Sequence, residues 1–141
     1  FDEGYSDTAY DEQGSYDGTL DARTGGSQTL ESEMWTLDGK VKKAVELDGT
    51  DDDVSMGDVL DFERTDTFTI SVWTKSTDNG GSVVSKMENS SAKGYELYFD
   101  NGHWEATIRH DNSTDEIKVL SLTDAGDDNW HHYCHVYRLL N

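Results

Sequence analysis

Carboxylates gather in one short stretch of this sequence, where they could hold a cation. The stretch contains Asp48, Asp51, Asp52 and Asp53, and Ca²⁺ takes about six to eight oxygen ligands. A strand is expected over residues 52–56, and alternation along it sends Asp51 and Asp53 to one face and Asp52 to the other. The spacing also differs from that of an EF-hand loop. We therefore interpret this cluster as a solvated turn.

A second group of ligand-forming side chains follows Trp130 and consists of His131, His132, Cys134 and His135. Residues two apart on a strand share a face, so His132 and Cys134 could both reach one Zn²⁺. Two ligands do not complete a zinc site, and the chain has no second cysteine to form a Cys-x-x-Cys pair. We therefore interpret this segment as core packing, and we expect Cys134 to be buried.

Aromatic side chains beside acids and amides are a third feature of the sequence that could bind a ligand. Sugar-binding proteins stack aromatic faces on the sugar and bond its hydroxyls with carboxylates and amides. Tyr5, Tyr10 and Tyr16 lie in the acidic amino-terminal segment, Trp35 borders the next segment, and Tyr98 lies in a strand pattern. These five residues are candidate ligand-binding residues, and packing roles for them stay open.

Turn signals divide the chain into short segments that must position these side chains. Proline is absent, and turns rich in Gly, Asn and Asp recur about every 8–12 residues, which is typical of an all-β sandwich or barrel. No segment has a convincing helical period, and residues 22–33 are expected to form a surface loop. The expected strands are residues 17–21, 34–38, 43–48, 52–56, 67–75, 82–88, 94–100, 103–109, 115–122 and 129–137.

Asn101-Gly102 predicts a two-residue hairpin between the strands over residues 94–100 and 103–109. Alternation gives this hairpin one apolar face and one polar face. The apolar face carries Tyr95, Leu97, Phe99, Trp104, Ala106 and Ile108. The polar face carries Glu96, Tyr98, His103, Glu105 and Arg109. Such a polar face suits sugar binding, and it also suits an ordinary solvated sheet, so both interpretations stay open.

Six segments of the chain follow a family pattern in their order and spacing. They are residues 1–4, 10–20, 44–54, 68–75, 94–98 and 130–132. Together they resemble the laminin-G-like branch of the concanavalin A-like lectin/glucanase superfamily. The resemblance implies an antiparallel two-sheet β-sandwich of the jelly-roll type, formed by residues 1–141 as a single domain. We expect five side chains to meet in its core, namely Leu47, Phe68, Ile70, Leu97 and Ile108.

The resemblance also bears on activity, because glucanases share this fold. Retaining glycosidases need two carboxyl groups about 5–5.5 Å apart, and the family supplies them from a Glu-x-Asp-x-Glu strand. This sequence lacks such a run, and Glu31-Ser-Glu33 is the nearest match. We therefore predict a non-catalytic module, of an exported or cell-surface protein, that binds a carbohydrate or a glycoprotein. The alternative is a protein–protein or adhesion module without sugar affinity.

Many relatives hold a Ca²⁺ at the edge of the sandwich with acids from the amino-terminal loop. The matching positions in this chain are Asp2, Asp11, Gly14 and Asp17, which the resemblance implies as metal ligands. Aspartates in turns also accept hydrogen bonds from their own backbone. A structural Ca²⁺ and a set of capped turns are therefore the two interpretations of this loop.

Charge and strand number bear on the partners of the protein. Asp and Glu number 30 against 11 Lys and Arg, for a net charge of -19, which argues against nucleic acids and anionic lipid surfaces. No window holds about 18 consecutive apolar residues, so no membrane span is expected. Relatives continue with further strands where this sequence stops at Asn141, so we expect the last family strands to be missing. Open sheet edges favour pairing, and we expect a homo-oligomer.

Overall fold

The backbone of this protein is almost entirely β. A computed structural model describes residues 4–63, 65–77, 80–88, 93–110 and 115–138. The described part of the chain contains eleven strands and one short 3-10 helix. None of the helical structure there is long and apolar enough to cross a membrane. The all-β fold class predicted from the sequence is therefore confirmed.

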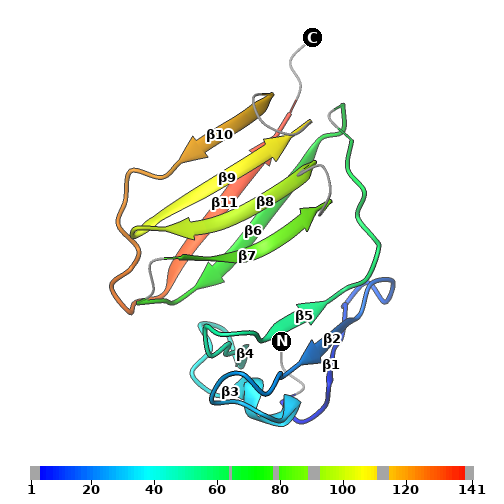
Figure 1. Cartoon of the computed structure of the whole chain (residues 1–141), viewed down its shortest axis with the longest axis vertical. Coiled ribbons are helices and arrows are strands. Elements are labelled where there is room, and N and C mark those ends of the chain that lie inside the picture. Colours follow the sequence, from blue (N-terminus) through cyan, green and yellow to red (C-terminus); the bar gives the residue numbers. More distant parts are fainter. Residues whose placement is uncertain (1–3, 64, 78–79, 89–92, 111–114, 139–141) are drawn as a thin grey trace. The chain divides into compact units, whose positions relative to one another are not determined.

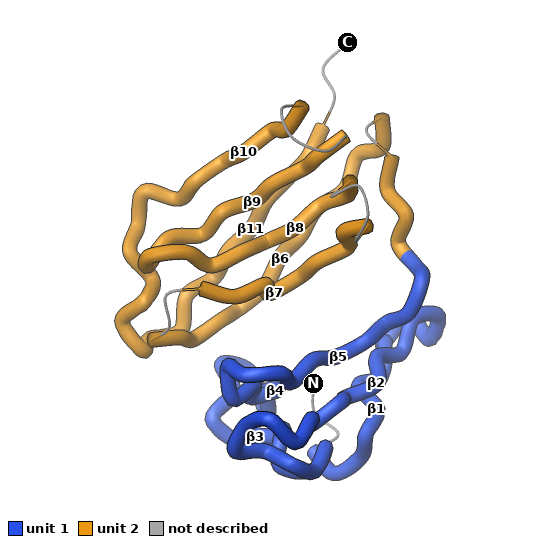
Figure 2. Tube along the Cα trace, viewed as in Figure 1, with its two compact units in different colours: residues 1–59 blue, residues 60–141 orange. Residues whose placement is uncertain are grey.

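The chain divides into two compact units, which Figure 2 colours separately. Unit 1 spans residues 1–59 and unit 2 spans residues 60–141. The single domain expected from the sequence stays a prediction.

Unit 1 is built from short strands around a small core. An antiparallel sheet in the order β1-β2-β5 contains β1 (Thr8–Ala9), β2 (Gly18–Asp21) and β5 (Asp53–Ser55). A separate pair contains β3 (Trp35–Thr36) and β4 (Ala44–Val45). Helix η1 (Glu31–Met34) lies at the end of the region expected to be a loop. The buried core residues are Ala9, Leu20, Ala22 and Met34.

Unit 2 contains two antiparallel sheets, which Figure 1 shows as two layers. The four-stranded sheet has the order β10-β9-β8-β7. Its strands are β7 (Gly80–Met87), β8 (Gly94–Asp100), β9 (His103–Arg109) and β10 (Glu116–Leu120). The second layer pairs β6 (Phe68–Thr74) with β11 (His131–Tyr137). The predicted hairpin at Asn101-Gly102 is present as the connection between β8 and β9.

The apolar faces of these two layers form the core of unit 2. Burial alternates along β8, where Tyr95, Leu97 and Phe99 are buried and their neighbours are half-buried. Leu97 and Phe99 belong to a cluster that also contains Trp104, and side chains of the second layer, including Ile70 and Tyr133, pack against it. Fully burying one such side chain contributes about 1.5–3 kcal/mol. This packing between layers makes unit 2 a β-sandwich.

Aromatic rings form the other end of this core. Phe68 stacks on Phe62 with ring centroids 4.7 Å apart, and it also contacts Tyr95 at 4.9 Å and Tyr137 at 5.5 Å. Ile70 and Ile108 pack against the same cluster. Four of the five predicted core residues therefore lie in the core of unit 2.

Two predictions about burial are wrong. Leu47 is 46% exposed, because β4 ends at Val45 and the alternating pattern does not continue beyond it. Cys134 is exposed, because Tyr133 and Tyr137 turn toward the core from the alternate positions of β11. Cys134 therefore lies on the outer face of the second layer.

Replacing Leu97 by Ala tests the packing between the layers. Leu97 is 0% exposed, so we expect Leu97→Ala to lower the free energy of unfolding by about 2–5 kcal/mol. Urea denaturation measures this change. Leu122 is 98% exposed, and Leu122→Ala should stay within about 0.5 kcal/mol of the parent chain. Equal effects of the two substitutions would contradict the proposed core.

His135 makes the stability of unit 2 depend on pH. It is half-buried beside the ring of Tyr133, and burial lowers its pKa below the ordinary value of 6.5. The unfolded chain therefore takes up this proton at a higher pH than the folded chain, so stability falls as the pH drops through 6.5. Urea denaturation at pH 7.5 and pH 5.5 measures this change. Between these two pH values, the free energy of unfolding should fall less for His135→Phe than for the parent chain. His110 is exposed and serves as the control. The free energy of unfolding of His110→Gln should fall between these pH values by as much as that of the parent chain.

Candidate functional site

The outer face of the four-stranded sheet carries polar side chains around one tyrosine. We call it the polar face. The strand registers place on it Ser82, Ser85, Glu96, Tyr98, Asp100, His103, Glu105, Thr107, Arg109, Glu116 and Lys118. The alternation predicted for the central hairpin is confirmed along β8 and along β9 from His103 to Ala106. Thr107 departs from it, since it lies on the outer face by register and is buried.

Tyr98 lies at the centre of the polar face. It pairs with Ser82 on β7 and with Glu105 on β9, and such directly opposed residues have Cβ atoms about 4.5–5.5 Å apart. A Cβ added at Gly80 would lie 3.0 Å from the Tyr98 hydroxyl, so the phenol group leans over this glycine. Tyr98 is half-buried, and it is an aromatic group within reach of hydroxyl and carboxylate neighbours.

Ion pairs neutralise part of the polar face. Lys118 Nζ lies 2.7 Å from Glu105 Oε2, and the hydrogen bond to Glu105 raises the pKa of Lys118. Arg109 Nε lies 3.0 Å from Glu116 Oε2. Thr107 Oγ1 donates a hydrogen bond of 3.2 Å to Glu105 Oε1. These pairs hold the charged side chains of β9 and β10 against the sheet.

The two carboxylates of β8 have other partners. Glu96 accepts a hydrogen bond from the Ser82 hydroxyl. Asp100 Oδ1 accepts one of 2.8 Å from Asn101 Nδ2. Within the described ranges, neither carboxylate forms an ion pair. Glu96 and Asp100 therefore contribute uncompensated negative charge on both sides of Tyr98.

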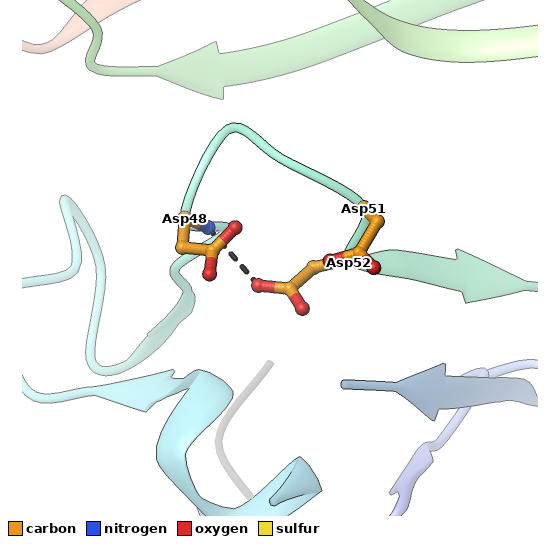
Figure 3. A group of neighbouring side chains, drawn as sticks. All are labelled: Asp48, Asp51 and Asp52. Atoms are coloured by element: carbon orange, nitrogen blue, oxygen red, sulfur yellow. Dashed lines mark hydrogen bonds between the residues drawn. The ribbon is translucent and has the colours of Figure 1, made fainter. Parts of the chain in front are cut away.

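A second candidate site is the acidic turn of unit 1, formed by Asp48, Asp51 and Asp52 (Figure 3). Each carboxylate offers an oxygen, and these three oxygens lie within 4.8 Å of one another. The prediction that alternation separates Asp51 from Asp52 is wrong. Strand β5 begins only at Asp53, so both residues belong to the turn, where alternation does not apply.

Backbone N–H groups from an earlier loop hold the acidic turn in place. Asp48 Oδ2 accepts hydrogen bonds from the backbone of Ser27 and Gln28, and its Oδ1 accepts one of 2.9 Å from Thr50. These bonds, led by that from Gln28, lower the pKa of Asp48. Asp51 Oδ2 accepts a bond of 3.1 Å from the N–H of Gly25. Asp48 therefore stays ionised, and the hydrogen bonds fix the acidic turn to residues 25–28.

Glycine permits this close approach. A Cβ at Gly26 would lie 1.8 Å from Asp48 Oδ2, and one at Gly25 would lie 2.6 Å from Asp51 Oδ2. Sequence reasoning missed the role of residues 25–28, and the Gly25-Gly26 pair was the only signal that could have indicated it. The sequence pattern predicts only a surface loop at this pair.

Two oxygens of the acidic turn have no hydrogen-bond partner among the described residues. Asp51 Oδ1 and Asp52 Oδ1 are buried and accept no hydrogen bond from the described residues, and the same holds for Gln28 Oε1 in the same unit. A buried carboxylate oxygen without a partner is costly. A hard cation with oxygen ligands would supply what these oxygens lack. The acidic turn therefore fits such an ion.

The loop that the resemblance implied as a calcium site is closed by its own backbone. Asp11 accepts hydrogen bonds from the N–H groups of Gln13, Ser15 and Tyr16, and these bonds, led by that from Gln13, lower its pKa. Asp17 Oδ1 accepts the N–H of Asp11 at 2.8 Å. The contacts of Asp11 and Asp17 are those of a capped turn.

The other two predicted ligands add little to this loop. Gly14 has a φ of 73° and donates its N–H to the carbonyl of Asp11 at 2.7 Å. Asp2 lies outside the described residues. Calcium binding by this loop therefore stays a prediction.

The predicted aromatic ligands do not behave alike. Tyr5, Tyr10 and Tyr16 are exposed at 80%, 60% and 44%. Trp35 packs against the core of unit 1 and donates its indole N–H to the carbonyl of Ser6 at 2.7 Å. Trp35 therefore has a packing role, while sugar binding by the three tyrosines stays a prediction.

The histidines after Trp130 have separate partners. His132 Nε2 lies 2.9 Å from Ser71 Oγ, and His131 Nε2 lies 2.7 Å from Asp127 Oδ1. Across the residues that the structure describes, they belong to no group of three metal ligands.

Glu33 accepts the N–H groups of Thr29 and Leu30, so it stabilises the start of η1.

Comparison with known families agrees with this architecture. The model of the concanavalin A-like lectin/glucanases superfamily matches residues 48–140, which include the acidic turn and nearly all of unit 2. The chain belongs to this superfamily, and the laminin-G-like resemblance is confirmed. Searches among curated proteins and among solved structures gave no match.

Proposed function

We propose that this protein is a non-catalytic carbohydrate-binding module, and that a glycan binds on the polar face. The observation that carries this proposal is the position of Tyr98, an aromatic ring among hydroxyls and carboxylates at the centre of an open sheet. An aromatic ring can stack on a sugar while neighbouring polar groups bond its hydroxyls. Membership of a superfamily that includes lectins supports the same function.

Two observations favour binding without catalysis. Glycoside hydrolysis needs two carboxyl groups about 5–10 Å apart, whereas the Cα atoms of Glu96 and Asp100 are about 13 Å apart and Glu105 is engaged by Lys118 and Thr107. Glu33, from the nearest match to the glucanase motif, is occupied by backbone hydrogen bonds. We also propose that the protein is located outside the cell or on the cell surface, where glycans and glycoproteins are available as ligands.

Tyr98→Ala tests the proposed glycan surface. On a glycan array, the parent chain should bind at least one class of oligosaccharide, and Tyr98→Ala should weaken that binding about tenfold. This factor corresponds to 1.4 kcal/mol, which lies within the range for an aromatic contact. Tyr98→Phe keeps the ring and should retain most of the affinity.

Tyr5→Ala is the matched control, because Tyr5 is an exposed tyrosine of unit 1. Loss of binding in Tyr5→Ala but not in Tyr98→Ala would move the site to the amino-terminal segment. Silence of the parent chain across the whole array would favour the alternative, an adhesion module without sugar affinity.

We also propose that the acidic turn holds a structural Ca²⁺. The supporting observation is the pair of buried carboxylate oxygens, on Asp51 and Asp52, that lack hydrogen-bond partners. Asp48 would add a third carboxylate. The bound ion would supply positive charge that offsets the repulsion among the three carboxylates.

Thermal unfolding in the presence and absence of Ca²⁺ tests this proposal. An ion that binds only the folded chain stabilises it by about 2.7 kcal/mol at a concentration 100 times its Kd. The melting temperature should therefore be higher with added Ca²⁺ than after a chelator has removed Ca²⁺. Asp51→Asn and Asp52→Asn should abolish the rise. Asp11→Asn is the control, and loss of the rise in that variant alone would place the ion in the amino-terminal loop.

The homo-oligomer expected from the sequence stays a proposal. Among the described strands, β6 and β11 each have one paired neighbour, so this layer has two open edges. On the core side of β10, Ile117 and Val119 are 53% and 45% exposed. Open edges and exposed apolar side chains both favour association with another chain.

A further inference from the structure

The charges around Tyr98 restrict which glycans the polar face can bind. We propose that its ligand is a glycan with free amino groups, of the glucosamine class. This inference rests on the proposed function, because it names the kind of sugar that the same face selects.

Three carboxylates surround Tyr98. Glu96 and Asp100 lie two residues before and after it on the same face of β8, and Glu105 lies directly opposite on β9. Lys118 neutralises Glu105 at 2.7 Å. Among the described contacts, Glu96 and Asp100 accept hydrogen bonds only from neutral groups. The surroundings of the ring are therefore negative.

The positive groups of this face do not offset this charge. Arg109 pairs with Glu116 at 3.0 Å. Its register partner on β8 is Gly94, so it is a diagonal neighbour of Glu96, and His103 lies directly opposite Asp100. Lys118 is occupied by Glu105. A sulfated or uronic-acid glycan would therefore meet two uncompensated carboxylates beside the aromatic ring, and like charges repel.

An ammonium group on a sugar has two favourable partners here. The face of an aromatic ring attracts a cation placed above it, and the neighbouring carboxylates attract the same charge while accepting its N–H groups. The net charge of -19 adds a longer-range attraction, which salt weakens.

The spacing of the carboxylates favours an extended ligand over a metal ion. Glu96 and Asp100 are four residues apart on one strand, so their Cα atoms are about 13 Å apart at about 3.3 Å per residue. One ion with ligand distances of about 2.3–2.6 Å cannot bind both of them readily. An oligosaccharide with an amino group on each sugar can place one amine near each carboxylate, with a ring over Tyr98.

Three oligosaccharides of identical length test the inference. Calorimetry at pH 6 should compare the glucosamine tetramer, its fully N-acetylated form and a uronic-acid tetramer. The free amines should give at least tenfold tighter binding than the N-acetylated form, and 0.15 M NaCl should reduce this preference. The uronic-acid tetramer should show no binding.

Variants show whether the preference arises on the polar face. Glu96→Gln and Asp100→Asn should each weaken binding of the free-amine tetramer more than binding of the N-acetylated tetramer, so that the preference for free amines falls. Glu12→Gln is the control, because it removes an exposed carboxylate from unit 1 and should leave the preference intact.

Three outcomes would overturn the inference. Equal affinity for the acetylated and free-amine tetramers would refute the selection of amines and leave glycan binding standing. An equal loss in Glu12→Gln and Glu96→Gln would show that the acidic chain attracts amines without a defined site. Absence of binding to all three tetramers, with silence on the glycan array, would refute the proposed function itself.

Discussion

The arrangement of unit 2 depends on one constraint, the alternation of side chains along its strands. Burial of Leu97 and its neighbours between two layers fixes one face of β8 inward. Tyr98 must then point outward, since successive residues of a strand face opposite ways. A shift of one residue in register would exchange the two faces, which would expose the core and bury charged groups. The interior packing and the polar face are therefore two consequences of the same register.

Unit 1 is held together differently, because its strands are too short to supply much packing. Carboxylates take over part of this role by accepting hydrogen bonds from backbone N–H groups. Asp11 closes its own loop, and Asp48 joins two loops that are distant in the sequence. Hydrogen bonds to charged groups are stronger than those between neutral groups. Part of the excess acid in this chain therefore has a structural role in its turns.

Membership of the lectin/glucanase superfamily accounts for the architecture, but one fold supports many functions. The side chains that the sheet presents around Tyr98 support the proposed glycan binding. Among the described residues, the ion pairs of β9 and β10 leave the carboxylates of β8 without an ion pair, and we propose that their charge makes the polar face selective. The proposed binding and selectivity thus depend on outward residues that the core does not constrain.

The sequence by itself determined the long strands of unit 2. Strands predicted over residues 94–100 and 103–109 have these bounds in the structure, because alternation and an Asn-Gly turn are local signals. It also determined that Tyr98 and Glu105 share a face. Only the tertiary structure decided that Leu47 is exposed and that Asp51 and Asp52 lie together. Those outcomes depend on where short strands end and on contacts with residues 25–28, which no local pattern records.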